Sequence, residues 1–149
     1  MFRLTACLTK RNKMITYNAY SEAMPQINTA TVTAWIQRVA EKHGKRIGNV
    51  NYIFCTDEEI LDVNRKYLQH DYYTDIITFD YCAHNILSGD IYISLDTVAS
   101  NAEEFAKNPD EELHRVLIHG ILHLVGINDK GPGEREIMER AEDEALAMR

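Results

Sequence analysis

The chain is poor in the residue types that mark several classes of protein. It has three cysteines, Cys7, Cys55 and Cys82, an odd number without a Cys-x-x-Cys pair. This scarcity argues against a disulfide framework and favours reduced thiols in a cytoplasmic protein. No apolar run approaches the roughly 18 residues that a membrane-spanning helix needs, so we expect no membrane association. The 149 residues suffice for one domain with a real core but not for two.

The chain also has fewer basic residues (16 Lys and Arg) than acidic residues (23 Asp and Glu), which gives a net charge of −7. That balance works against nonspecific binding to nucleic acid, and we expect no DNA partner. Many acids have local roles, however: residues 57–59 and 110–112 are acidic triplets at predicted helix starts, where they favour the helix dipole. The predicted last helix carries six more. The acidic total therefore leaves room for a local basic groove.

Apolar periodicity, caps and turn residues predict four strands and five helices. The strands are expected at 14–21, 47–55, 75–80 and 89–94, and the helices at about 29–43, 57–67, 96–107, 109–125 and 133–148. The short loop between the last two strands predicts that they pair antiparallel. This order predicts an α+β fold, in which a small mixed sheet of about four strands packs with about five helices. We assign this single domain to residues 14–149 and interpret residues 1–13 as a tail or a misassigned start.

The helix expected at 109–125 carries the strongest functional signal. From Val116 to Val125 it is apolar nearly all round, so it should be buried, and His119 and His123 interrupt it on one face. Hydrogen bonds alone satisfy most such histidine pairs. Here Gly120 costs about 1 kcal/mol relative to alanine within a helix, which indicates a close approach, and Gly126 is followed three residues later by Asp129.

Together these features predict a metal site with His119, His123 and Asp129 as ligands. Three protein ligands leave a coordination position for water, as in a hydrolytic zinc site. The pattern His-x-x-x-His-x-x-Gly-x-x-Asp parallels that of the metzincins, whose third ligand follows a turn at glycine. Metalloproteases carry a glutamate directly after the first histidine as general base. Because Gly120 occupies that position, a peptidase is disfavoured.

Several separated blocks of the chain resemble the YbeY family of bacterial rRNA maturation factors. The blocks are Asn-Arg-Lys-Tyr at 64–67, Thr-Asp-Ile-Ile-Thr-Phe at 74–79, Gly-Asp-Ile-Tyr-Ile-Ser at 89–94, the histidine motif at 119–126, and Met138. The resemblance covers nearly all of residues 14–148. It implies a cytoplasmic, metal-dependent, single-strand-specific endoribonuclease in 16S rRNA maturation and ribosome quality control. Its implied partners are ribosomal RNA and components of the small ribosomal subunit.

The chain departs from the family pattern at two positions. Asp129 stands where the family usually has a third histidine, and Leu68 stands where it usually has an arginine. Aspartate remains a good ligand for one zinc ion per chain, although its hardness makes manganese or iron more acceptable. An arginine would hold phosphate or a developing oxyanion, which Leu68 cannot do. The neighbouring Arg65 and Lys66 are candidate substitutes.

The expected mechanism is metal-assisted hydrolysis of an RNA phosphodiester, for which the residue pattern does not identify the general base. Asp75, Asp80 and Asp90 lie on or beside the central strands and could reach the site, and Asp75 and Asp90 are the candidates for the catalytic residue. Thr74, Asp75 and Lys66 are the expected substrate contacts. Two alternatives stay open: a metal-dependent hydrolase of a peptide or amide, and a non-catalytic ribosome assembly factor whose metal is structural.

Overall fold

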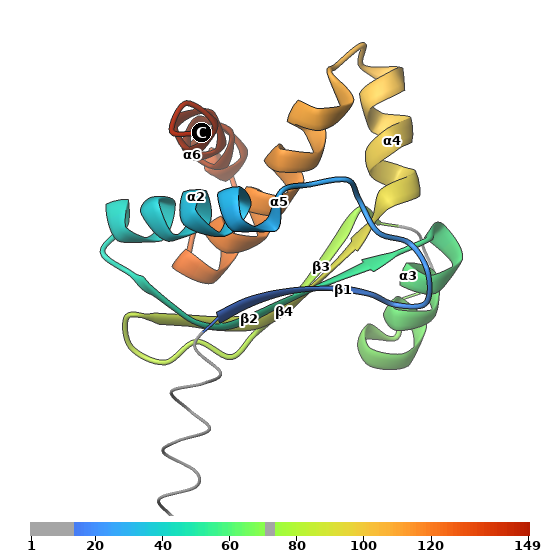
Figure 1. Cartoon of the computed structure of the whole chain (residues 1–149), viewed down its shortest axis with the longest axis horizontal. Coiled ribbons are helices and arrows are strands. Elements are labelled where there is room, and N and C mark those ends of the chain that lie inside the picture. The colour runs from blue at the N-terminus through green and yellow to red at the C-terminus, as the bar shows by residue number, and fades with distance from the viewer. Residues whose placement is uncertain (1–13, 71–73) are drawn as a thin grey trace, which may run out of the picture.

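The computed structural model describes residues 14–70 and 74–149, so the interpretation of residues 1–13 concerns a segment outside this range. The described part of the chain forms five α-helices and a four-stranded sheet, whose arrangement can be followed in Figure 1. The elements are β1 (Met14–Ala19), α2 (Thr29–Lys42), β2 (Arg46–Cys55), α3 (Asp57–Val63), the π-helical turn η1 (Asn64–Leu68), β3 (Ile76–Asp80), β4 (Ile86–Ser94), α4 (Leu95–Glu104), α5 (Pro109–Val125) and α6 (Glu134–Leu146). No helix among these residues is both long and apolar enough to cross a membrane.

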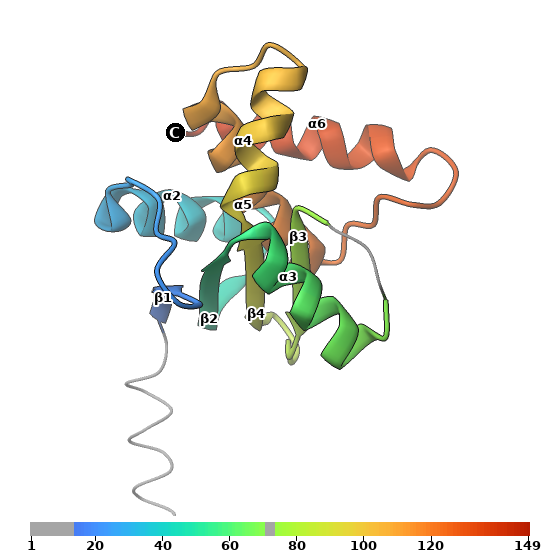
Figure 2. The same ribbon diagram turned by 90° about the vertical axis from the view of Figure 1, so that its right-hand side faces the viewer.

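The sheet is mixed, as predicted, with the strand order β1-β2-β4-β3 (Figure 2). β1 and β4 both pair parallel with β2, and β3 pairs antiparallel with β4. The expected antiparallel pair is therefore confirmed. β4 begins at Ile86 rather than at residue 89, because the chain pairs again directly after a tight turn, through a bridge between Ala83 and Ile86.

Side chains alternate between the two faces of the sheet. On one face, called the α5 face, the sheet packs against α2 and α5 to form the main core (Figure 1). Its buried sheet residues are Ile15, Val50, Tyr52, Phe54, Leu87, Ile91 and Ile93. The other face, called the α3 face, packs with Ile60 and Val63 of α3 into a smaller cluster. Its sheet residues include Ile53, Ile77, Phe79 and Tyr92.

Buried polar contacts fix the positions of α5 and α6. The hydroxyl of Tyr52 donates a 2.7 Å hydrogen bond to the carbonyl of Leu117 in α5. The indole of Trp35 in α2 donates a 2.8 Å hydrogen bond to the carbonyl of Ala145 in α6. Because buried polar groups need such partners, these bonds specify where each helix lies. The prediction that α5 is buried is confirmed, since residues 116–118 and 120–122 are all buried.

Candidate metal centre

Both ends of α5 are set by local chemistry that the sequence predicts. The side chain of Asn108 accepts hydrogen bonds from the backbone N–H groups of Asp110 and Glu111, at 2.9 and 3.1 Å. Pro109 occupies the first turn, where its missing N–H costs nothing. Gly126 ends the helix in the left-handed conformation, with φ of 114°. This turn folds the following segment back along α5 and brings Asp129 over the helix.

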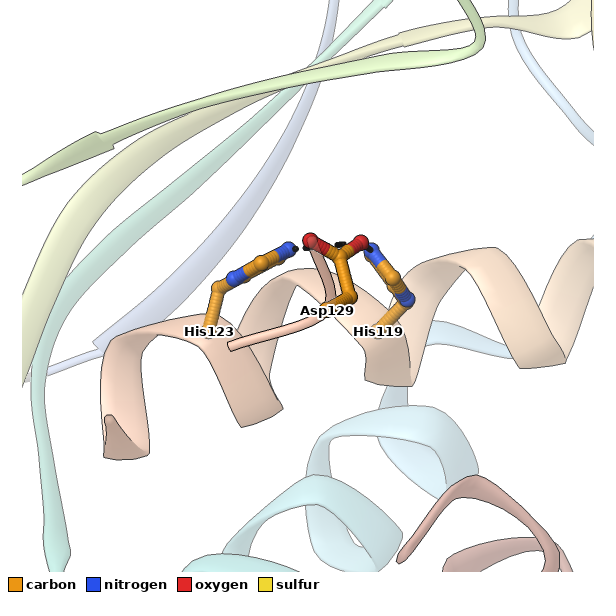
Figure 3. Close-up of side chains that lie close together, drawn as sticks. All are labelled: His119, His123 and Asp129. Atoms are coloured by element: carbon orange, nitrogen blue, oxygen red, sulfur yellow. Dashed lines mark ion pairs between the residues drawn. The ribbon is translucent and has the colours of Figure 1, made fainter. Parts of the chain in front are cut away.

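His119, His123 and Asp129 converge on one point above α5 (Figure 3). The Nε2 atoms of His119 and His123 lie 3.3 and 3.4 Å from the same oxygen, Oδ2 of Asp129. The ligand atoms of the three residues all lie within 4.8 Å of one another. Each side chain is between 19% and 28% exposed, so the group is partly buried and open on one side.

This donor set fits a zinc ion or a similar transition metal. Two imidazole nitrogens and one carboxylate oxygen are ordinary zinc ligands, and three protein ligands are typical of catalytic sites. Bonds of about 2.0–2.1 Å in a tetrahedral site place ligand atoms roughly 3.3 Å apart. The two distances to Asp129 match that spacing. Among the described residues, this is the group of His, Cys, Asp and Glu side chains whose spacing suits a metal ion.

The two imidazoles differ in their proton affinity. Burial opposes protonation of His119, but the hydrogen bond and charge of Glu142, helped by Asp129 and Asp75, raise its pKa above the ordinary value. For His123, burial and then the charge of His119 lower the pKa, against the opposing effect of Asp129. Because a metal ligand must be deprotonated, protons would compete with a metal ion mainly at His119.

Two clefts open on either side of this group. The β3 cleft has a volume of about 630 Å³ and is lined by Thr74, Asp75, Ile76, Thr78, Asp80, His123, Leu124, Asn128, Asp129, Lys130 and Glu134. The α6 cleft has about 610 Å³ and is lined by residues from α5, α6 and the α4–α5 connection, together with Asp75 and Asp129. Volumes of about 300–1,000 Å³ are typical of small-ligand sites. A bound chain running from one cleft into the other would cross His119, His123 and Asp129, which are called the candidate metal group, or metal group, below.

Asp75, one of the predicted candidates for the general base, lines both clefts. Its backbone is held in place by a 2.9 Å hydrogen bond from the Ser94 N–H to the Asp75 carbonyl. Burial raises the pKa of its carboxyl group, while the charge of His119 and backbone hydrogen bonds oppose that rise. A raised carboxyl pKa near a cleft is a feature of acid–base residues.

The other predicted site residues lie in different places. Thr74 lines the β3 cleft beside Asp75, and its hydroxyl donates to the Ile76 carbonyl at 3.3 Å. Asp90 lies on the α3 face, where it accepts a 2.9 Å hydrogen bond from the Asn51 amide, so the structure does not bring it to the metal group. Lys66 is outside the linings of both clefts and pairs with Asp62 at 3.2 Å.

Two residues near this group, Lys130 and Glu142, were not predicted from the sequence. Lys130, directly after Asp129, lines the β3 cleft and lies close enough to His123 to lower its pKa. Glu142 of α6 accepts a 2.6 Å hydrogen bond from Nδ1 of His119. A signal for Glu142 does exist in the sequence, because it falls within the buried stripe of α6 formed by Met138, Ala141 and Ala145.

Comparison with known protein families identifies the same region of the chain. The family described as "Endoribonuclease YbeY" matches residues 16–148. A Bacteroides thetaiotaomicron protein named Endoribonuclease YbeY is 65% identical over 135 residues, which cover 91% of this chain and 98% of that protein. A Porphyromonas gingivalis protein of the same name is 49% identical over 137 residues and 91% of each chain.

A solved structure also shares the fold. The solution structure of a Thermotoga maritima protein superposes with a TM-score of 0.68 and is 27% identical in sequence. The match covers 91% of this chain and 88% of the other. The α+β fold with a four-stranded mixed sheet is therefore confirmed by comparison as well as by the strand pairing.

Proposed function

Since this chain belongs to the YbeY family of endoribonucleases, we propose that it is a zinc-dependent endoribonuclease that cleaves single-stranded RNA during 16S rRNA maturation and ribosome quality control. The activity is assigned to the domain formed by residues 14–149. Its proposed partners are ribosomal RNA and components of the small ribosomal subunit. The cytoplasm is the proposed compartment, in keeping with the reduced cysteines Cys55 and Cys82.

The observation that carries this proposal is the convergence of His119, His123 and Asp129 between two clefts. These three side chains would hold one zinc ion, with manganese or iron as alternatives because Asp129 supplies a hard oxygen. When bound, the ion would supply a Lewis acid for the phosphodiester and lower the pKa of a water molecule. Both clefts give the substrate access to this point.

Asp75 is the proposed general base. It lines both clefts together with Asp129, which places it beside the proposed metal ligands. The raised pKa makes the carboxylate a stronger base than an exposed aspartate. After accepting the proton from the water, the carboxyl group could return it to the departing ribose oxygen. Asp90 is less suitable because its side chain is engaged on the opposite face of the sheet.

We assign the positioning of the substrate to the β3 cleft. The hydroxyl groups of Thr74 and Thr78 line it and can hydrogen-bond to phosphate or ribose oxygens. Lys130 is the cation of this lining, and we assign to it the phosphate contact that Leu68 cannot make. Leu68 itself lies at the end of η1, 38% exposed and outside the linings of both clefts.

Hydrolysis of a peptide or amide is less well supported by the site. In metalloproteases the residue after the first histidine carries the base, and here Gly120 faces the sheet, next to Ile91 and Ile76. A longer side chain at this position would enter the core rather than the cleft. The base must therefore come from another element. We assign it to Asp75, which lines both clefts, rather than to Asp80 or Glu134, which line only the β3 cleft.

The deciding experiment compares metal-loaded and chelated protein on a single-stranded fragment of 16S rRNA. We expect cleavage by the zinc-loaded protein, none after chelation, and none by His119→Ala. His84→Asn serves as the matched control, because His84 is exposed in the β3–β4 turn and asparagine tolerates its positive φ of 57°. Zinc binding without RNA cleavage, with ribosomal particles still bound, would instead favour the assembly-factor alternative.

A further inference from the structure

Glu142 is a buried carboxylate whose two oxygens are both engaged. Its side chain is 8% exposed and lies against α5 although it belongs to α6. Oε2 accepts a hydrogen bond from Nδ1 of His119 at 2.6 Å, and Oε1 accepts one from Nη1 of Arg115 at 2.9 Å. A buried charge is costly unless it is paired and hydrogen-bonded, so this arrangement is specific.

We infer that Glu142 is a positioning residue for the metal site, acting through His119. The inference rests on the proposed function, because it concerns the metal group described above. A carboxylate only accepts hydrogen bonds, so contact with Glu142 requires the proton of His119 to sit on Nδ1. The Nε2 lone pair is then free and faces Asp129 at 3.3 Å. Glu142 thereby selects the tautomer and ring orientation that a metal ligand needs.

Arg115 holds Glu142 in the required place. Its guanidinium donates to Glu142 and, through Nη2, to Asp143 at 2.7 Å. Arg115 and His119 are four residues apart, so both project from the same face of α5. Arg115 holds the Glu142 carboxylate in place, and His119 donates its Nδ1 proton to that carboxylate. The docking of α6 on α5 is thus coupled to the orientation of a metal ligand.

The second histidine lacks this support. Among the described residues, no carboxylate contacts Nδ1 of His123, whose polar contact runs from Nε2 to Asp129 at 3.4 Å. Loss of Glu142 should therefore impair one ligand and leave the other two in place. The expected result is a weakened site rather than an abolished one, which separates this role from that of a ligand.

The test is Glu142→Gln, which keeps the size of the side chain and removes its charge. If the glutamine N–H₂ group faces Arg115, which can only donate, that contact is lost. If it faces His119, Nδ1 can accept from it only when the ring proton moves to Nε2, and Nε2 is then no longer free to bind a metal. We expect zinc affinity, measured by competition with a chromophoric chelator, to fall about 10–100-fold. The visible spectrum of the cobalt-substituted protein should change as well. With saturating zinc, kcat on single-stranded RNA should fall more than KM rises.

Two further variants define the specificity of the effect. Glu139→Gln is the matched control, since Glu139 also lines the α6 cleft but is exposed and pairs with Arg135 at 3.1 Å. It should bind zinc like the unaltered protein. Glu142→Asp retains the carboxylate on a shorter side chain and should recover part of the lost affinity. A purely structural role for Glu142 would lower thermal stability in these variants without this order of zinc affinities.

The outcomes separate the inference from the proposal beneath it. If the unaltered protein fails to bind zinc, both are overturned; if Glu142→Gln binds zinc as tightly as the unaltered protein, only the role of Glu142 is overturned. Should Glu142→Gln not fold, by circular dichroism, the ¹⁵N chemical shifts of His119 in the metal-free, unaltered protein decide. At a pH where the ring is neutral, a proton on Nδ1 supports the inference, and a proton on Nε2 overturns it.

Discussion

Gly120 of α5 lies so close to Ile91 of β4 that a Cβ atom at position 120 would sit 3.0 Å from both Cδ1 and Cγ2 of Ile91. Such contacts are tighter than those of ordinary side-chain packing. The absence of a side chain at residue 120, between His119 and His123, lets α5 lie directly on the sheet. This close approach determines how far His119 and His123 lie from the β3 edge of the sheet, where Asp75 is located.

Gly120→Ala tests this contact. Alanine gains about 1 kcal/mol of helix propensity, but overpacking of a rigid core costs about 1–3 kcal/mol. Because Ile91 is fully buried, we expect a net loss of about 1 kcal/mol in the free energy of unfolding, measured with urea. Gly120→Glu should lose about 3 kcal/mol or more, since it buries an unpaired charge.

Ile91→Val supplies the control for this prediction, because it removes Cδ1, one of the two Ile91 atoms that a Cβ at residue 120 would meet. Added to the valine variant, Gly120→Ala should cost less than it does alone, and the double-mutant cycle measures that coupling. A Gly120→Ala protein stabilised by the full helix propensity would show that the sheet yields and that the close approach is not required.

Asp75→Asn separates the contribution of Asp75 to catalysis from its effect on stability. Burial raises the pKa of the Asp75 carboxyl group above its ordinary value of 3.8. The native state therefore retains a proton that the unfolded chain has lost, so stability falls as the pH rises from about 4 through the native pKa. At neutral pH the charged carboxylate is destabilising in the metal-free protein, and asparagine removes that cost.

The variant should accordingly unfold at a higher temperature than the parent at pH 7, and its stability should depend less on pH between 4 and 7. For a domain of this size each kcal/mol corresponds to roughly 2–4 °C in Tm. RNA cleavage should fall about 100-fold or more if Asp75 is the base. Asp90→Asn, on the opposite face, should cleave normally; the reverse pattern of activities would move the base to Asp90.

The parts of the site that local sequence determines were the ones that could be predicted. The caps at Asn108 and Gly126 and the helical spacing of His119 and His123 depend on residues within one or two turns. The antiparallel pairing of β3 and β4 depends on a short loop. Such features involve neighbours in the chain, so composition and spacing suffice to predict them.

The remaining parts depend on contacts between distant segments. Asp90 follows Gly89 at the start of a recognisable block, but its face is set by the register between β4 and β2, where Asn51 stands opposite. A shift of one residue would have turned it toward α5. Glu142 lies 23 residues beyond His119, and its partner is fixed by how α6 docks. Helix packing of this kind leaves only a weak trace in the sequence, a carboxylate within an apolar stripe.

Asp129→Ala removes the proposed third ligand and should weaken zinc binding more than about 100-fold, beyond the effect expected for a residue behind the ligands. Asp129→His restores the residue usual in the family and should bind zinc well, with less preference for manganese, since nitrogen replaces a hard oxygen. Competition with a chelator for each metal measures both effects.

Asp80→Asn is the control for the Asp129 variants. Asp80 lines the same cleft, but its Oδ1 accepts a 2.8 Å hydrogen bond from the Cys82 N–H and it stands outside the metal group. Zinc affinity should be unchanged in this variant. Equal weakening by Asp80→Asn and Asp129→Ala would mean that the negative charge of the cleft, and not ligation by Asp129, holds the ion.

Lys130→Met tests which cation holds the RNA. Lys130 lines the β3 cleft beside the metal group, whereas Lys66 pairs with Asp62 on an exposed helical surface. Each phosphate contact on a single strand contributes about 0.7 to the slope of log K against log salt. Loss of Lys130 should therefore reduce that slope by about 0.7 and raise KM, with zinc affinity nearly unchanged.

Lys66→Met should leave the slope as it is, because an exposed pair outside the clefts makes no contact with the bound strand. If Lys66→Met alone lowers the slope, the RNA follows the surface of η1, and the original expectation for Lys66 holds in place of the assignment to Lys130.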